Sequence, residues 1–259
     1  MTNVNRLFRE RLEIPYDKVI TFENLNAILE KAMKTIPFEN MSIIENRTDE
    51  ITKENLVNKI FVQNEGGLCY ELNTIFYFFL LENGFDIYLI RAMRYDYSNQ
   101  TWKETLGKTH VANIIIHNGK SYIADIGFGG NSPLTLVPMN GEPVTSNNGE
   151  FKVENVECEP GDHIFYMKLK HKDTEWKIRY AFDSKKVLKD LEEINEVQSI
   201  NTNHPASNFN KKPLITKFTD NGMIILTDTS FTEWIDGKVK KEEIDRRLFP
   251  SFAKRYFSV

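Results

Sequence analysis

The thiol of Cys69 is the side chain whose setting in this sequence most favours nucleophilic chemistry. Gly66 and Gly67 precede it, and an apolar stretch over residues 72–81 follows it. Apolar residues recur there at intervals of three and four, which predicts a helix with one buried face that ends near Gly84. Cys69 would then lie in the first helical turn, where unpaired amide groups and the helix dipole favour a thiolate. Because most free cysteines are buried packing residues, the thiol indicates chemistry only if a base lies nearby.

A histidine and an aspartate supply such a base and its orienting group if two predicted strands pair in a hairpin. Asn118-Gly119 is a typical two-residue hairpin turn between two apolar, strand-like stretches. This turn places Ala112 opposite Asp125, and the alternation of side chains then puts His110 on the same face as Asp125. Diagonal neighbours lie about 7–8 Å apart at the backbone, so the carboxylate can meet an imidazole nitrogen. A register shift of one residue would put the two groups on opposite faces.

Cys69, His110 and Asp125 together form a complete set for activating a nucleophile. Two of them also have structural interpretations. A histidine before an apolar strand is often a packing residue, and an aspartate before a glycine-rich turn often caps that turn. The sequence contains no His-x-His, Cys-x-x-Cys or His-Glu-x-x-His spacing, so no metal site is expected.

The composition is that of a soluble globular protein. The 259 residues are 41% hydrophobic and 27% charged, which suits one large domain or two to three small ones. A net charge of −4 at pH 7 gives no basic face for nucleic acid. Cys69 and Cys158 suggest no disulfide framework, which fits a reducing compartment. Residues 1–11 have no apolar signal core and no stretch is long enough to span a membrane, so we expect a cytoplasmic protein without a membrane partner.

Helical patterns fill the chain up to about residue 85. Helices are predicted over residues 3–11, 21–36 and 52–61, ahead of the helix that carries Cys69. The second of them begins at a capping box and ends before Pro37. The first third of the chain is therefore predicted to be a helical domain.

Short strands dominate the rest of the chain, with helices predicted at 190–200 and 241–248. The pattern predicts an α+β protein with a helical domain at 1–85, a β-barrel domain at 86–195 and a small α/β domain at 196–259. The predicted strands cover residues 87–94, 111–116, 121–125, 164–169, 176–180, 214–218 and 223–226.

Five short motifs together resemble the arylamine N-acetyltransferase family. They occur in the order found in that family, and the likeness spans nearly the whole chain, which makes it specific. The motifs are Ile36-Pro37-Phe38-Glu39-Asn40, Gly66-Gly67-Leu68-Cys69-Tyr70-Glu71, Thr109-His110-Val111, Asp125-Ile126-Gly127-Phe128-Gly129 and His204-Pro205-Ala206-Ser207-Asn208-Phe209.

The resemblance implies a fold and a reaction. The fold would be a helical first domain, a β-barrel and an α/β domain acting as a lid, around a papain/transglutaminase-like core with the triad Cys69, His110 and Asp125. The implied enzyme is an acyltransferase of xenobiotic metabolism, a monomer or homodimer that needs no metal. Acetyl-CoA, its co-substrate, would acetylate the cysteine, and an arylamine, hydrazine or related amine would then accept the acetyl group.

The resemblance also implies roles for residues around the triad. One set would line the acceptor pocket and another would lie where the pantetheine arm of CoA reaches the cysteine. Each pocket residue could instead be a core residue. The acceptor set is Phe38, Val111, Phe128 and Phe209, and the CoA set is Thr109, Gly129 and Gly130.

One position departs from the family pattern. The family usually has an arginine immediately before the two glycines, and this chain has Glu65. Such an arginine could pair with Glu39 and hold the cysteine loop, whereas Glu65 cannot. If Glu65 faces the thiol, its charge disfavours the thiolate and slows acylation. We therefore expect a folded enzyme with weaker activity or stability than its relatives.

Two other functions fit the same residues. A cysteine hydrolase or transglutaminase-like enzyme can also carry Cys, His and Asp in this order. A homologue that has lost turnover would bind CoA or an aromatic ligand without forming an acetyl-cysteine. The sequence alone leaves both alternatives open.

Overall fold

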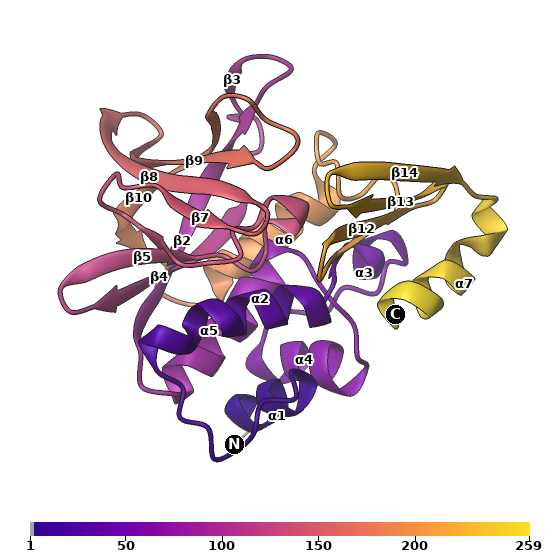
Figure 1. Ribbon diagram of the computed structural model, residues 1–259, viewed down its shortest axis with the longest axis horizontal. Coiled ribbons are helices and arrows are strands. Elements are labelled where there is room, and N and C mark those ends of the chain that lie inside the picture. Colours follow the sequence, from indigo (N-terminus) through magenta and orange to yellow (C-terminus); the bar gives the residue numbers. More distant parts are fainter. Residues whose placement is uncertain (1–2) are drawn as a thin grey trace.

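The computed structural model describes residues 3–259 apart from the side chain of Cys158, so the second cysteine of the sequence lies outside the described side chains. Helices from the N-terminal part pack below a barrel-like sheet, and a smaller sheet from the C-terminal part lies beside them (Figure 1). The predicted fold class, with a helical first part and a central barrel, is confirmed. In the described part of the chain, no helix is long and apolar enough to cross a membrane.

The N-terminal helices agree with the predicted ones, with one short addition after Asn40. The helix predicted to start at Thr21 begins as a short 3-10 turn, and the one predicted at 52–61 ends in a π-helical turn. The helices are α1 (Val4–Arg11), α2 (Leu25–Thr35), α3 (Met41–Ile44), α4 (Lys53–Val57) and α5 (Cys69–Glu82).

Helix α5 is the element on which the other parts pack. It begins at Cys69, and Gly84 after its end has φ +81°, as the glycine at a helix end predicts. The expectation of a single buried face is wrong for the first half, because every residue from Cys69 to Phe76 is buried. Phe8 of α1 stacks on Phe79 on one side, with ring centroids 4.3 Å apart, and the barrel covers the other. The first half of the helix is enclosed on both sides, so it has no solvent-exposed face.

The larger sheet is antiparallel and nearly closes into a barrel. Its strands run in the order β6-β5-β4-β2-β10-β9-β8-β7, with β3 (Thr101–Trp102) paired to β2. A hydrogen bond of 2.9 Å from the amide of Gly141, in the loop after β6, to the carbonyl of Val153 on β8 brings the two sides of the sheet together. The strands are β2 (Asp86–Asp96), β4 (His110–His117), β5 (Lys120–Ala124), β6 (Val137–Pro138), β7 (Val144–Ser146), β8 (Gly149–Cys158), β9 (Gly161–Leu169) and β10 (Lys177–Val187).

The predicted register of the β4–β5 hairpin is confirmed. His117 pairs with Lys120 and Asn113 pairs with Ala124, as a two-residue turn requires. Asn118 and Gly119 have φ values of 49° and 72°, the two positive angles of a type I′ turn. The local turn therefore sets which side chains of β4 face the start of α5.

The smaller sheet joins C-terminal strands to one short strand from the N-terminal part of the chain. Its order is β1-β11-β12-β13-β14, and α6 (Glu192–Asn203) precedes its C-terminal strands. Since β1 pairs with β11, a short segment of the predicted helical domain belongs to this sheet. The domain boundaries at residues 85 and 195 remain predictions. The strands are β1 (Phe38–Glu39), β11 (Leu214–Thr219), β12 (Gly222–Thr227), β13 (Ser230–Ile235) and β14 (Lys238–Glu243).

The charged helix predicted at 241–248 is wrong. The first part of that stretch belongs to β14, residues 246–248 form a 3-10 turn, and α7 (Phe249–Phe252) starts beyond it. Asp236 and Gly237 have φ values of 48° and 78°, so they form a type I′ turn that returns the chain alongside β13. This Asp-Gly turn signal outweighs the helix-like spacing of charges after it.

Asn40 fastens the C-terminal part to the helical part. Its Nδ2 donates to the carbonyls of Phe209 and Lys212 at 2.7 and 2.8 Å, and its Oδ1 accepts from the Leu214 amide at 2.8 Å. The side chain is buried. Beside it, the amide of Glu39 donates to the Gly67 carbonyl at 3.0 Å. The short β1 segment thus lies between the cysteine loop and β11.

We expect Asn40→Ala to lower the free energy of unfolding by about 3 kcal/mol, because buried carbonyl and amide groups lose their partners. Urea denaturation measures the change. Asn208→Ala, at an exposed position in the neighbouring motif, is the matched control and should change stability by less than about 0.5 kcal/mol. Equal effects of the two substitutions would contradict the role assigned to Asn40.

Candidate active site

Glycines allow the close contacts that bring Cys69 to the barrel. A Cβ on Gly66 would lie 2.0 Å from the Pro37 carbonyl oxygen, and one on Gly127 would lie 2.7 Å from the Cys69 Cα. The thiol is 5% exposed, and its S–H donates to the Thr109 carbonyl at 3.6 Å. The cysteine therefore lies at the start of α5 and packs against the beginning of β4, the strand that carries His110.

His110 and Asp125 meet as the hairpin register predicts. His110 Nε2 lies 2.7 Å from Asp125 Oδ2, with the side chains 2% and 0% exposed. The other carboxylate oxygen, Oδ1, accepts from the Gly127 amide at 2.9 Å. Tyr180 of β10 donates its hydroxyl to Oδ2 at 3.3 Å. The carboxylate is buried and well supplied with donors, so it can hold the imidazole in one orientation.

Asn73 connects these groups to the cysteine helix. It stands one turn after Cys69, and its Nδ2 donates to Asp125 Oδ1 and to the Val111 carbonyl, each at 2.8 Å. Its Oδ1 accepts from the Ile126 amide at 3.0 Å. The sequence reasoning missed Asn73, although its spacing of four from Cys69 would have placed both on one helix face.

Electrostatics at the site favour a protonated imidazole. Burial lowers the pKa of His110, but the charge of Asp125, the hydrogen bond to it and the neighbouring Cys69 sulfur outweigh burial and raise that pKa from 6.5 to about 9. The ring is then an imidazolium at neutral pH, next to the cysteine. Such a pair can hold a thiolate as an ion pair.

Comparisons with known proteins identify the protein family to which this chain belongs. A model of the N-acetyltransferase family matches residues 21–259. The structure of arylamine N-acetyltransferase C from Bacillus anthracis is 37% identical and covers 100% of this chain and 99% of its own, with a TM-score of 0.92. The chain belongs to the arylamine N-acetyltransferase family. It is thereby an acyltransferase, and the family resemblance seen in the sequence is confirmed.

Two further structures show the fold and its variation. An arylamine N-acetyltransferase from Bacillus cereus, described as having a unique Cys-His-Glu catalytic triad, is 36% identical over 100% of this chain and 99% of its own, with a TM-score of 0.93. Here the corresponding carboxylate contact to His110 comes from an aspartate. The enzyme from Mycobacterium marinum, in complex with CoA, shares the fold at 18% identity over 98% of this chain and 92% of its own, with a TM-score of 0.83.

A cavity of about 310 Å³ opens at the thiol. Most of the residues assigned by resemblance to the acceptor and to CoA line it, whereas Val111 is fully buried in the core and its role remains a prediction. Among the described residues, no group of three or more His, Cys, Asp or Glu side chains could hold a metal ion. The assigned residues that line the cavity are Phe38, Phe128, Phe209, Thr109, Gly129 and Gly130.

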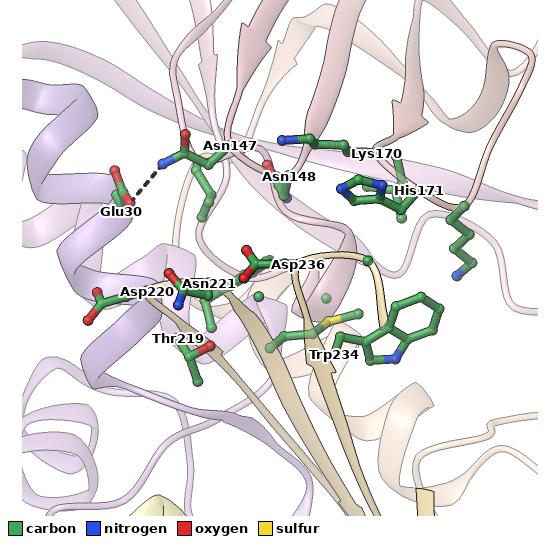
Figure 2. A pocket seen from close by; sticks show the side chains of 18 residues that line it. Glu30, Asn147, Asn148, Lys170, His171, Thr219, Asp220, Asn221, Trp234 and Asp236 are labelled. Atoms are coloured by element: carbon green, nitrogen blue, oxygen red, sulfur yellow. Dashed lines mark hydrogen bonds between the residues drawn. The ribbon is translucent and has the colours of Figure 1, made fainter. Parts of the chain in front are cut away.

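A second cavity, of about 270 Å³, adjoins the first and shares Gly130, Lys172 and Met223 with it. Figure 2 shows Glu30 of α2 and Asn147, joined by a hydrogen bond of 3.5 Å, on one side of this cavity, and His171 and Trp234 on the other. It lies between the helices, the barrel turns and the β11–β12 turn. A long substrate could therefore extend from the thiol past Gly130 into this space.

Glu65, where the family usually has an arginine, pairs with another residue. Its Oε2 lies 2.9 Å from Arg47 Nη1, with the side chains 15% and 37% exposed. Arg47 also pairs with Glu45. Because Arg47 compensates the charge of Glu65, the proposed weakening of the thiolate by Glu65 stays a prediction that the geometry does not favour.

Lys59 pairs with Glu39, the residue with which the family's arginine could pair, and also with Glu71. Its Nζ lies 2.5 Å from Glu71 Oε1 and 3.5 Å from Glu39 Oε1, and it donates to Ser42 Oγ at 3.0 Å. Glu71 in turn accepts from the Leu68 amide at 2.8 Å, directly before the cysteine. Lys59 therefore fastens the cysteine loop to β1, a role that sequence reasoning missed because ten residues separate it from Cys69.

The pKa directions agree with this arrangement. Burial lowers the pKa of Lys59, but the charges of Glu71 and Glu39 outweigh burial and raise it. Burial raises the pKa of Glu71, and the nearby Glu39 adds to that rise while Lys59 opposes it. Two buried carboxylates thus share one ammonium, and removing the ammonium would leave both unpaired.

We expect Lys59→Met to lower the free energy of unfolding by about 3–5 kcal/mol, the cost of breaking a buried ion pair on one side. Glu65→Gln, the matched control, removes a partly exposed pair and should cost less than about 1 kcal/mol. Urea denaturation of both variants tests this difference, and Lys59→Arg should recover part of the loss. A larger loss for Glu65→Gln than for Lys59→Met would refute the assignment of the loop's cation to Lys59.

Proposed function

We propose that this protein transfers an acetyl group from acetyl-CoA to an arylamine, hydrazine or related amine through an acetyl-Cys69 intermediate. The observation that carries the proposal is the contact of 2.7 Å between His110 and Asp125 beside a cysteine at the start of a buried helix. These groups supply a nucleophile, a base and an orienting carboxylate. Family membership supplies the reaction class.

In the first step, the Cys69 thiolate attacks the acetyl carbonyl of acetyl-CoA. Amide groups in the first turn of α5 stabilise the oxyanion, since they lack helical partners. The carbon–sulfur bond to CoA then breaks, and the imidazolium of His110 gives its proton to the departing thiolate. The products are acetyl-Cys69, free CoA and a neutral imidazole held by Asp125.

In the second step, the amine nitrogen attacks acetyl-Cys69. His110 removes a proton from the amine, the new amide bond forms and the carbon–sulfur bond breaks, which restores the Cys69 thiolate and the imidazolium. Phe38, Phe128 and Phe209 give the acceptor cavity aromatic walls. Such walls favour an aromatic amine over water, which argues against a hydrolase.

We assign the donor to the side of the cavity formed by Thr109, Gly129 and Gly130. The complex of the M. marinum relative with CoA supports CoA as the carrier. The pantetheine arm would pass Gly130, where a Cβ would lie 2.7 Å from the Met223 sulfur, so a side chain at that position would narrow the path. The second cavity would then bind the end of CoA that lies farthest from its sulfur.

We also propose that the protein works in the cytoplasm, with a role in xenobiotic metabolism. The proposed nucleophile is a free, buried thiol that must stay reduced, which suits a reducing compartment.

Incubation with acetyl-CoA should add one acetyl group to the wild-type chain, because the acyl-enzyme is a stable intermediate when no amine is present. Intact-mass measurement detects it, and peptide mapping should place it on Cys69. Cys69→Ala should show no addition, and addition of an arylamine should remove the group from the wild type. A chain that binds CoA but never gains mass would be a binding protein, contrary to our proposal.

We expect Asp125→Asn to slow alkylation of Cys69 by iodoacetamide at pH 7 by at least about tenfold. Without the Asp125 charge, burial lowers the pKa of His110 from about 9, so the ring is no longer an imidazolium that pairs with the thiolate at neutral pH. The rate should then rise with pH as for an ordinary thiol. Tyr180→Phe, which removes one donor to Asp125, is the matched control with a smaller effect. Coincident pH profiles for wild type and Asp125→Asn would rule out the ion pair.

A further inference from the structure

The active-site cavity has cationic walls without acidic ones. Arg94 and Lys172 line it together with His110, and none of the described lining residues is an aspartate or a glutamate. His110 already has Asp125 as its counter-charge. The cavity therefore presents positive potential to a molecule that enters it, which attracts an anion and repels a cation.

Arg94 is the half-buried cation of this cavity, whereas Lys172 is exposed. Arg94 stands on β2 opposite Tyr180 of β10, with its guanidinium carbon 5.3 Å from the centroid of the Phe209 ring. Among the side chains and carbonyls that the structure describes, none forms a hydrogen bond or ion pair with this guanidinium. Arg91, three residues earlier on the strand, differs: it pairs with Glu196 at 3.0 Å and donates to the Lys108 carbonyl at 2.9 Å.

An unpaired guanidinium in this setting is destabilised. Burial lowers the pKa of Arg94, and the Cys69 sulfur opposes that change. Its N–H donors form a fork that matches a carboxylate, which can accept two parallel hydrogen bonds. A carboxylate brought into the cavity would give the donors acceptors and the charge a partner.

We propose that Arg94 binds an anionic group of the acceptor, so that arylamines carrying a carboxylate or similar anion are preferred. This inference rests on the proposed acetyl transfer. The guanidinium of Arg94 lies over the ring of Phe209. The Phe209 ring also meets the Phe38 ring edge to face, with centroids 5.9 Å apart. An arene beside these rings would have its anion at Arg94 and its amine directed to the cysteine.

The donor is the other possible source of an anion, and its chemistry does not fit this position. The phosphates of CoA lie at the end of a long pantetheine arm, far from the sulfur that carries the acetyl group. Arg94 lies in the same cavity as Cys69 and interacts with it electrostatically. When the thioester is at Cys69, the phosphates lie beyond the reach of Arg94.

Steady-state kinetics with p-aminobenzoate and its neutral isostere p-aminobenzamide test the proposal. In a two-step reaction through an acetyl-enzyme, kcat/KM for the acceptor reports the second step alone. The wild type should favour p-aminobenzoate by at least about tenfold, the value of one charge-assisted hydrogen bond. Arg94→Gln should abolish this preference through KM, and Arg94→Lys should restore part of it. Lys172→Gln, the other cation of the cavity, should keep the preference.

The outcomes separate the possible roles of Arg94. If Arg94→Gln slows both acceptors equally, together with acetylation of Cys69, the guanidinium serves the thiolate or the fold and the proposal is wrong. Loss of the preference in Lys172→Gln instead would also overturn it. A wild type that acetylates both acceptors equally refutes the inference and leaves the proposed function standing. If no acetyl-enzyme forms at all, calorimetric binding of p-aminobenzoate decides, since Arg94→Gln must still weaken it by at least about tenfold.

Discussion

A buried carboxylate is the constraint on which the arrangement of this protein depends. Asp125 is fully buried, and an unpaired charge in such a place would cost several kcal/mol. Its oxygens accept from Asn73 on α5, His110 on β4, Tyr180 on β10 and the amide of Gly127. Each donor comes from a different part of the fold, so the charge is satisfied only when helix and barrel are docked in one position. The same docking puts the thiol beside the imidazole.

Close backbone contacts make this position rigid. Gly127 passes so near the Cys69 Cα that no side chain fits there, and Gly66 does the same at the Pro37 carbonyl. The cysteine loop is thus held between the loop after Asp125 and β1. An interior packed this tightly does not shift continuously, so the nucleophile keeps a fixed distance from its base. Flexibility for substrates must come from the open side of the cavity.

Local signals explain what could be predicted from the sequence. The glycines and apolar spacing around Cys69 define α5, and Asn118-Gly119 defines the register that joins His110 to Asp125. The spacing of four from Cys69 would also have indicated Asn73, but Tyr180 could not be found this way, because it reaches Asp125 from 55 residues away. The false helix at 241–248 shows the converse. The Asp236-Gly237 turn before that stretch has two positive φ angles and directs the chain into a strand, which is a stronger local constraint than the charged residues after it.

This chain has Glu65 where the family usually has an arginine, yet the positive charge beside Glu39 is still present. What the site needs is a cation at that place in the fold, and different positions of the sequence can supply it. Glu39 and Glu71 are both buried, so some cation must lie between them, and Lys59 supplies it from the π-helical turn before the cysteine loop. Once that need is met, the residue before the glycines is free to be acidic, provided that Arg47 balances it. Arg94 is the opposite case. No carboxylate of the described chain meets its guanidinium, and a cation that the fold leaves unpaired inside the reaction cavity favours a partner that arrives with the substrate.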